Sequence, residues 1–242
     1  MKPHCHVWLC LAAFLLSART AVAAEPVVVE LFTSQSCSSC PPAEALLGEL
    51  ADRPAVIALE YHVDYWNDLI HGLAGRWRDP FSTRAHTERQ RDYNMAIRHR
   101  RDVYTPQVVI DGRTEAVGSS RADIERLLKS AAKDRTGRVT VQLRRAADDR
   151  LIVGIDGPAA MADVWLVRFD RRHITEVPAG ENKGKKLINR HVVSETMRLG
   201  SWGGKPEEFA AMMPLADNQG CAVLVQSASL GPILGAALCP MP

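Results

Sequence analysis

The sequence has 242 residues, of which 46% are hydrophobic, and its 30 lysines and arginines nearly balance its 28 acidic residues. This composition is typical of a globular protein, and the length suits one large domain or two small ones. The balanced charge excludes strong electrostatic attraction to nucleic acids or acidic membrane surfaces, so no nucleic acid partner is expected.

The first 23 residues have the pattern of a targeting segment. Lys2 precedes an apolar run over residues 7–16, and Ala21-Val22-Ala23 has the small-x-small form of a signal-peptide cleavage site. Because the run is too short to span a bilayer, residues 1–23 are predicted to be a removed signal peptide, with an uncleaved anchor as the alternative. We therefore expect a protein that is periplasmic or secreted, without stable membrane insertion.

Four of the six cysteines lie beyond the expected cleavage site. An even number of cysteines in an exported chain indicates disulfide chemistry, because the compartment is oxidising. Spacing favours two pairs, which are Cys37 with Cys40 and Cys221 with Cys239.

Residues 24–134 alternate strand and helix patterns. Residues 27–32 are short and almost wholly apolar, as in a buried strand, and residues 41–50 begin with two prolines and carry one apolar helical face. The elements expected next are a strand at 55–61, a weakly patterned helix at 82–97, a strand at 107–110, a tight turn at Asp111-Gly112, a short strand near Ala116 and a helix beginning after Ser120.

The resulting order of elements predicts an α/β sheet with covered faces. A hairpin closing one edge of such a sheet is the thioredoxin arrangement, so a thioredoxin-like domain is expected over residues 24–134. Beyond the polar stretch 133–137, strands are expected at 139–143, 151–155, 164–169, 221–227 and 232–238, with a short helix near 207–212. Several short strands separated by turns indicate a mainly-β, sandwich-like domain over residues 138–242.

The segment Cys37-Ser38-Ser39-Cys40 lies between the first strand and the first helix. Backbone N–H groups at a helix N-terminus stabilise an anion, so Cys37 is expected to be the exposed nucleophile and Cys40 the more buried resolving thiol. Two cysteines three positions apart close a small disulfide that exchanges readily. Three other interpretations stay open: a structural disulfide, half of a zinc site, and a Cu(I) site in which His62 joins the two thiolates.

Two further features are assigned to the same site. Thr105-Pro106 precedes the third strand, where a cis-proline loop would lie beside the cysteines and Thr105 would offer its backbone to a substrate; a trans proline is the alternative. Glu30 stands in an otherwise apolar strand, where an isolated charge is costly. We interpret it as a carboxyl with a raised pKa that passes protons to Cys40, the alternative being a strand end open to water.

Polar and aromatic side chains follow the second strand, at the end of an α/β sheet where sites form. We expect substrate contacts from His62, Asp64 and Trp66, the alternative being a hydrogen-bonded structural loop.

The second cysteine pair is expected to be structural. Residues 221–227 and 232–238 predict a hairpin centred on residue 230, which would place Cys221 opposite Cys239 at a separation that suits a disulfide.

A longer series of motifs points to a family. Residues 29–34 lead into Cys37 to Pro42, and the other motifs are His62-Val63-Asp64-Tyr65-Trp66, Asp79-Pro80-Phe81, Arg89-Gln90, Tyr104-Thr105-Pro106-Gln107, residues 189–193 and residues 231–237. With them the chain resembles a bacterial family of secreted, thioredoxin-like proteins catalogued as a domain of unknown function. The resemblance implies a thioredoxin fold with a C-terminal β domain and no particular substrate. Ser36 replaces the tryptophan of ordinary thioredoxins, and Glu30 lies one position further from the first cysteine.

These features together predict dithiol–disulfide exchange with the thiols and disulfides of other envelope proteins, without a cofactor or a resident metal. Cys37 would form the mixed disulfide, Cys40 would resolve it, and Pro106 would position the partner. The alternatives are a Cu(I) chaperone that uses the same cysteines and a non-catalytic interaction module.

Overall fold

The computed structural model describes residues 25–69, 77–134, 136–158 and 160–240. The expected signal peptide lies outside these ranges. Within them, no helix is long and apolar enough to cross a membrane.

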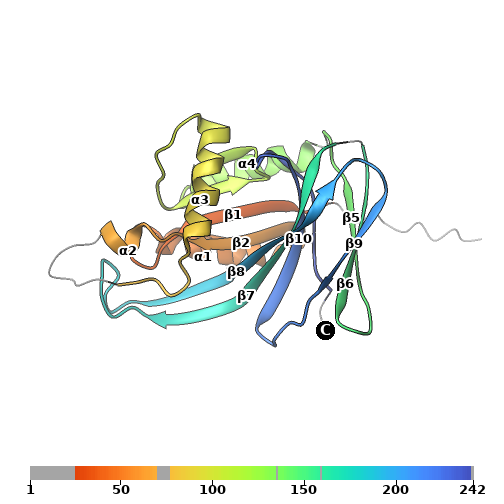
Figure 1. The fold of residues 1–242 in the computed structure, drawn as a ribbon. Helices are drawn as coiled ribbons and strands as arrows, with labels where there is room; N and C mark the ends of the chain where they lie inside the picture. Colours follow the sequence, from red (N-terminus) through yellow and green to blue (C-terminus); the bar gives the residue numbers. More distant parts are fainter. Residues whose placement is uncertain (1–24, 70–76, 135, 159, 241–242) are drawn as a thin grey trace, which may run out of the picture.

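The described chain is mixed α/β, with strands predominating (Figure 1). Its helical elements are α1 (Pro41–Ala51), α2 (Trp66–Leu69), α3 (Arg84–Tyr93), the π-helical turn η1 (Asn94–Arg98) and α4 (Arg121–Lys133). Its strands are β1 (Val27–Thr33), β2 (Val56–His62), β3 (Gln107–Ile110), β4 (Thr114–Val117), β5 (Thr140–Arg145), β6 (Arg150–Asp156), β7 (Ala162–Glu176), β8 (Lys186–Trp202), β9 (Glu207–Met212), β10 (Gln219–Ser227) and β11 (Ile233–Leu238).

The larger sheet has eight strands in the order β11-β10-β7-β8-β2-β1-β3-β4. Strands β1 and β2 are parallel, as expected for strands joined through a helix, and β3 pairs with β1 in the antiparallel direction. The hairpin β3–β4 forms the edge, and its turn at Asp111-Gly112 places both residues at positive φ, 49° and 63°. The order of elements and the hairpin at the edge agree with the prediction from the sequence.

The C-terminal strands depart from the expected separate sandwich. Residues beyond the expected boundary contribute β7, β8, β10 and β11 to the same sheet as β1–β4, with β8 beside β2 through the pair Glu60 and Val192. Within the described ranges, β5, β6 and β9 form a second sheet. That sheet packs on β7 and β10 through a core in which Val153 and Ile155 lie with Leu166 and Val223. The expected second β layer is therefore present, but the sheet on which it packs is continuous with strands β1–β4.

Two further expectations are corrected. Residues 207–212 form β9, because they pair with β6 and Phe209 joins the core, instead of the expected helix. Strand β8 was not expected, since its long polar sequence lacks strict alternation. It runs for 17 residues against the 15 of β7, so the two strands form the long hairpin that crosses Figure 1.

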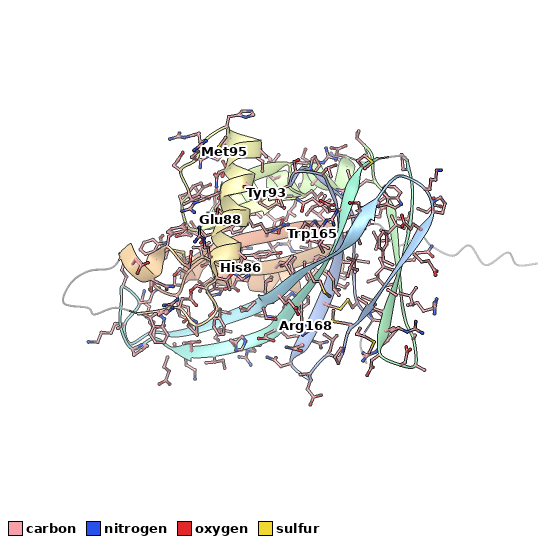
Figure 2. All side chains as sticks on the ribbon, in the orientation of Figure 1. His86, Glu88, Tyr93, Met95, Trp165 and Arg168 are labelled. Atoms are coloured by element: carbon pink, nitrogen blue, oxygen red, sulfur yellow. A yellow bond between two sulfur atoms is a disulfide. The ribbon has the colours of Figure 1, made fainter. Side chains whose placement is uncertain are left out.

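Alternate side chains of β1 serve two different cores. Val29 and Leu31 pack with Leu46 and Leu47 of α1. Val28 and Phe32 pack on the opposite face with residues that include Tyr93 of α3, labelled in Figure 2. This alternation decides which polar side chains of β1 and β2 reach the cysteine loop, which lies between β1 and α1.

Candidate functional site

Cys37 and Cys40 form a disulfide at the start of α1, with 5.4 Å between their Cα atoms. Cys40 occupies the N-cap position, and its carbonyl accepts the backbone N–H groups of Ala43 and Glu44. Two prolines occupy the first helical positions, where a missing N–H costs nothing. The expected position of the pair at a helix N-terminus is therefore confirmed.

The exposure of the pair differs from expectation. Cys37 was expected to be exposed, but both cysteines have 0% exposure. The intervening Ser38 and Ser39 are exposed, and Ser39 Oγ lies 3.3 Å from Cys37 Sγ. The loop thus presents its serines to solvent and its sulfur atoms to the interior.

The tip of the β7–β8 hairpin, residues 177–185, is bonded to this loop. The side-chain amide of Asn182 donates to the carbonyls of Gln35 and Cys37, at 2.9 Å each, and Asn182 has no exposed surface. The Ser38 N–H donates to Glu181 Oε2 at 2.8 Å. Neither residue carries a motif signal, and sequence analysis missed both because the hairpin brings them from more than 140 positions away.

The Thr105–Pro106 peptide is cis. A Cβ added to Gly118 would lie 3.0 Å from Ala43 Cβ and 3.1 Å from Pro106 Cβ, so Gly118 lets Pro106 pack near the first turn of α1. Trp66 Nε1 donates to Thr105 Oγ1 at 2.6 Å. Pro106 therefore lies beside the cysteine-bearing helix, and Trp66 supports the loop that carries it.

Glu30 does not lie toward the cysteines. It shares the α3 face of the sheet with Val28 and Phe32, and there Arg89 Nε donates to its Oε1 at 2.8 Å and Tyr93 OH to its Oε2 at 2.5 Å. The expected proton transfer to Cys40 is corrected for a geometric reason. Successive strand residues point to opposite faces, and α1 covers the other one.

His62 is fully buried between two carboxylates. Its Nδ1 lies 2.6 Å from Asp79 Oδ2, and its Nε2 lies 2.9 Å from Glu60 Oε1. Burial opposes a charged ring, but the two carboxylates outweigh burial and raise the pKa of His62 well above its ordinary value. Since both nitrogens are occupied, His62 is not free to join the cysteines as a copper ligand. No cluster of three or more metal-binding side chains is found within the described ranges.

This buried group is continuous with the cysteine loop. Asp79 Oδ2 also accepts the Gln35 N–H at 2.8 Å, and Asn189 of β8 donates to Glu60 Oε1 at 2.6 Å. Despite burial, the His62 charge and the backbone N–H groups of Gln35 and Phe81 lower the pKa of Asp79. Asp64, which is expected to contact substrate, accepts a bond from Thr87 Oγ1 and holds its loop.

Glu44 is the functional candidate that sequence analysis missed. It lies one helical turn after Cys40, is 3% exposed, and accepts a bond from Thr33 Oγ1 at 2.7 Å. Burial, reinforced by the Glu60 carboxylate, raises its pKa to about 8. The sequence signal that could have identified Glu44 is its position four residues after Cys40, next to the apolar face of α1.

Cys221 and Cys239 form the second disulfide, with 5.2 Å between their Cα atoms. The Cys239 N–H donates to the Cys221 carbonyl, and the register of β10 and β11 pairs Ala222 with Leu238. The two cysteines are therefore directly opposed, as the hairpin centred on residue 230 predicts.

The site belongs to a mixed α/β protein whose cysteine pair, in C-x-x-C spacing and at disulfide distance, is compatible with redox chemistry. Residues 28–226 match the family described as protein of unknown function (DUF1223), and the chain belongs to this family. Among curated proteins, none matches the chain significantly.

One solved structure is similar over nearly its full length. The crystal structure of an Agrobacterium tumefaciens protein shares 33% sequence identity and a TM-score of 0.75, covering 88% of this chain and 93% of that chain. A domain of the outer membrane lipoprotein Omp28 from Porphyromonas gingivalis shares 6% identity and a TM-score of 0.24, covering 43% and 86%. The second likeness is too weak to indicate a shared fold.

Proposed function

We propose that the protein is an extracytoplasmic thiol–disulfide oxidoreductase whose residues 25–134 form a thioredoxin-like unit. The observation that carries the proposal is the Cys37–Cys40 disulfide at the N-terminus of α1. The order β2-β1-β3-β4, with the pair between β1 and α1 and Pro106 packed near it, supports the thioredoxin-like assignment. The substrates are thiols and disulfides of other envelope proteins.

The reaction is a reversible exchange of disulfides. Because Cys37 has no exposed surface in the oxidised protein, the first step requires the cysteine loop to open. A substrate thiolate then attacks Cys37 Sγ, the mixed disulfide forms, and the bond to Cys40 breaks, leaving Cys40 as a thiolate that takes up a proton. The second substrate thiol loses its proton and attacks the substrate sulfur of the mixed disulfide, so that the substrate disulfide forms and Cys37 leaves as a thiolate that takes up a proton. Two electrons and two protons pass from the substrate to the cysteine pair, and the reverse steps reduce a substrate disulfide.

Two features suit these steps. Glu44 is a buried carboxyl with a pKa of about 8, one turn from Cys40, and in this proposal it supplies the proton that the departing sulfur needs. A groove of about 470 Å³ between α1 and β8 has Pro41, Glu44 and Ile188 in its lining, so a substrate segment can lie against the start of the helix.

Insulin reduction and refolding of reduced ribonuclease test the proposal. Wild-type protein is expected to accelerate at least one of these reactions, and Cys37→Ser and Cys40→Ser to lose the acceleration while keeping wild-type circular dichroism. If the wild type accelerates neither reaction, or if Cys37→Ser keeps its rate, the proposal is wrong and the interaction-module interpretation gains.

A further inference from the structure

The tip of the β7–β8 hairpin places a negative charge on the cysteine loop. In a redox pair at a helix start, free backbone N–H groups are what stabilise a cysteine thiolate. Here the N–H of Ser38, the residue after Cys37, is already donated to the Glu181 carboxylate at 2.8 Å. Glu181 thus uses a donor beside Cys37 and adds a like charge next to the developing thiolate.

Asn182 fixes this arrangement. Its amide bonds the carbonyls of Gln35 and Cys37, and Lys185 Nζ donates to Asn182 Oδ1 at 2.9 Å. The hairpin tip is itself closed by backbone bonds between Val177 and both Gly184 and Lys185. The carboxylate of Glu181 is therefore held at Ser38 by a buried anchor on the neighbouring residue.

We propose that Glu181 and Asn182 are positioning residues of the redox pair: Asn182 docks the hairpin on the loop, and the Glu181 carboxylate disfavours the Cys37 thiolate. The inference rests on the proposed function, because it assigns a setting of thiol reactivity to a hairpin outside residues 25–134. Compared with a helix start that lacks this hairpin, the Cys37 thiol is expected to be a weaker acid. The dithiol form is expected to be less stable relative to the disulfide form.

The other charged groups around the loop come from several elements. Glu44 lies on α1, His62 on β2, Asp79 before α3, and Lys185 on the hairpin itself. The substitution Glu181→Gln leaves these four side chains in place, so it tests the effect of the Glu181 charge alone. The glutamine keeps an oxygen that can accept the Ser38 N–H.

The test measures the pH dependence of Cys37 alkylation in the reduced protein and its equilibrium with glutathione. Glu181→Gln is expected to lower the apparent pKa of Cys37 and to shift the equilibrium toward the dithiol by about two- to fivefold, as expected for one charge at a helix terminus. The difference from wild type is expected to shrink at 1 M salt, because screening weakens a charge effect and not a packing effect.

Glu176→Gln is the matched control, since it removes a carboxylate from an exposed position of the same hairpin. Asn182→Ala is expected to speed reduction of the oxidised pair by dithiothreitol. If Glu181→Gln gives the same alkylation profile and glutathione equilibrium as Glu176→Gln, the proposal is overturned. Failure of the proposed function would give a different result, because the wild-type protein would then accelerate neither insulin reduction nor ribonuclease refolding.

Discussion

The central sheet buries charged side chains on both of its faces, and the two clusters that they form differ in what they contact. On the α3 face, Glu30 forms a 2.8 Å ion pair with Arg89 and accepts a bond from Tyr93. On the α1 face, the group formed by Glu60, His62 and Asp79 is bonded into the cysteine loop. One cluster joins secondary structure elements, and the other is bonded to the backbone of the loop that carries the cysteine pair.

The difference teaches that a buried carboxylate is not by itself a sign of proton transfer. Arg89 also bonds Gln226 of β10, so the Glu30 cluster ties α3 to the C-terminal strands. Glu44, in contrast, accepts a hydrogen bond from the neutral Thr33 hydroxyl and has its pKa raised to about 8. A carboxyl with a pKa near neutrality can both give and take a proton.

The largest expected effect comes from breaking the α3-face cluster. Arg89→Ala leaves the Glu30 carboxylate buried without its cation and is expected to destabilise the fold by about 3–5 kcal/mol. Urea denaturation measures the loss, and a double variant Glu30→Met/Arg89→Met is expected to recover much of it. Alkylation of Cys37 in the folded single variant should match wild type; a changed pH profile would mean that the two clusters are coupled.

The second disulfide allows a similar comparison between a structural pair of cysteines and the pair proposed to exchange. Cys221 and Cys239 close a loop of 18 positions between paired strands, so the double variant Cys221→Ala/Cys239→Ala is expected to lose about 3 kcal/mol of stability. Its exchange activity toward insulin should stay at the wild-type level, measured at a temperature where both proteins are folded. Loss of exchange in a folded variant would instead indicate a relay between the two pairs.

A smaller effect is expected from Glu44→Gln. Because the pKa of Glu44 is raised to about 8 in the fold, the folded protein binds a proton that the unfolded chain has released, so wild-type stability falls as pH rises from about 4.5 to 8. The variant should lose this dependence and be more stable than wild type at pH 9, where the wild-type carboxyl must ionise in its buried position. Urea midpoints at pH 5, 7 and 9 measure it, and parallel curves for the two proteins would contradict the raised pKa.

The sequence predicts much of the first half of the fold because its signals are local. Paired prolines, an apolar helical face and a two-residue turn identify α1 and the β3–β4 hairpin without reference to the rest of the chain. The cysteine pair, its position at a helix start and the opposition of Cys221 to Cys239 follow from spacing in the same way.

The remainder depends on contacts between distant segments. Glu30 has the same sequence context whichever face it points to, and only the packing of α1 and α3 decides that Arg89 is its partner. The β7–β8 hairpin places β8 beside β2 and brings Glu181 and Asn182 to the cysteine loop. The polar sequence of β8 gives no local signal for this strand, so these contacts could not be predicted. Tertiary pairing, and not propensity, determines these parts of the site.

The reactivity of the two disulfides in the native protein tests the redox assignment most directly. The oxidised protein is incubated with glutathione under native conditions, quenched by alkylation at successive times, and mapped by mass spectrometry. The expected result is that Cys37–Cys40 exchanges and reaches equilibrium while Cys221–Cys239 stays closed. If Cys37–Cys40 stays closed until the protein is unfolded, the pair is a structural disulfide and the proposed function is wrong.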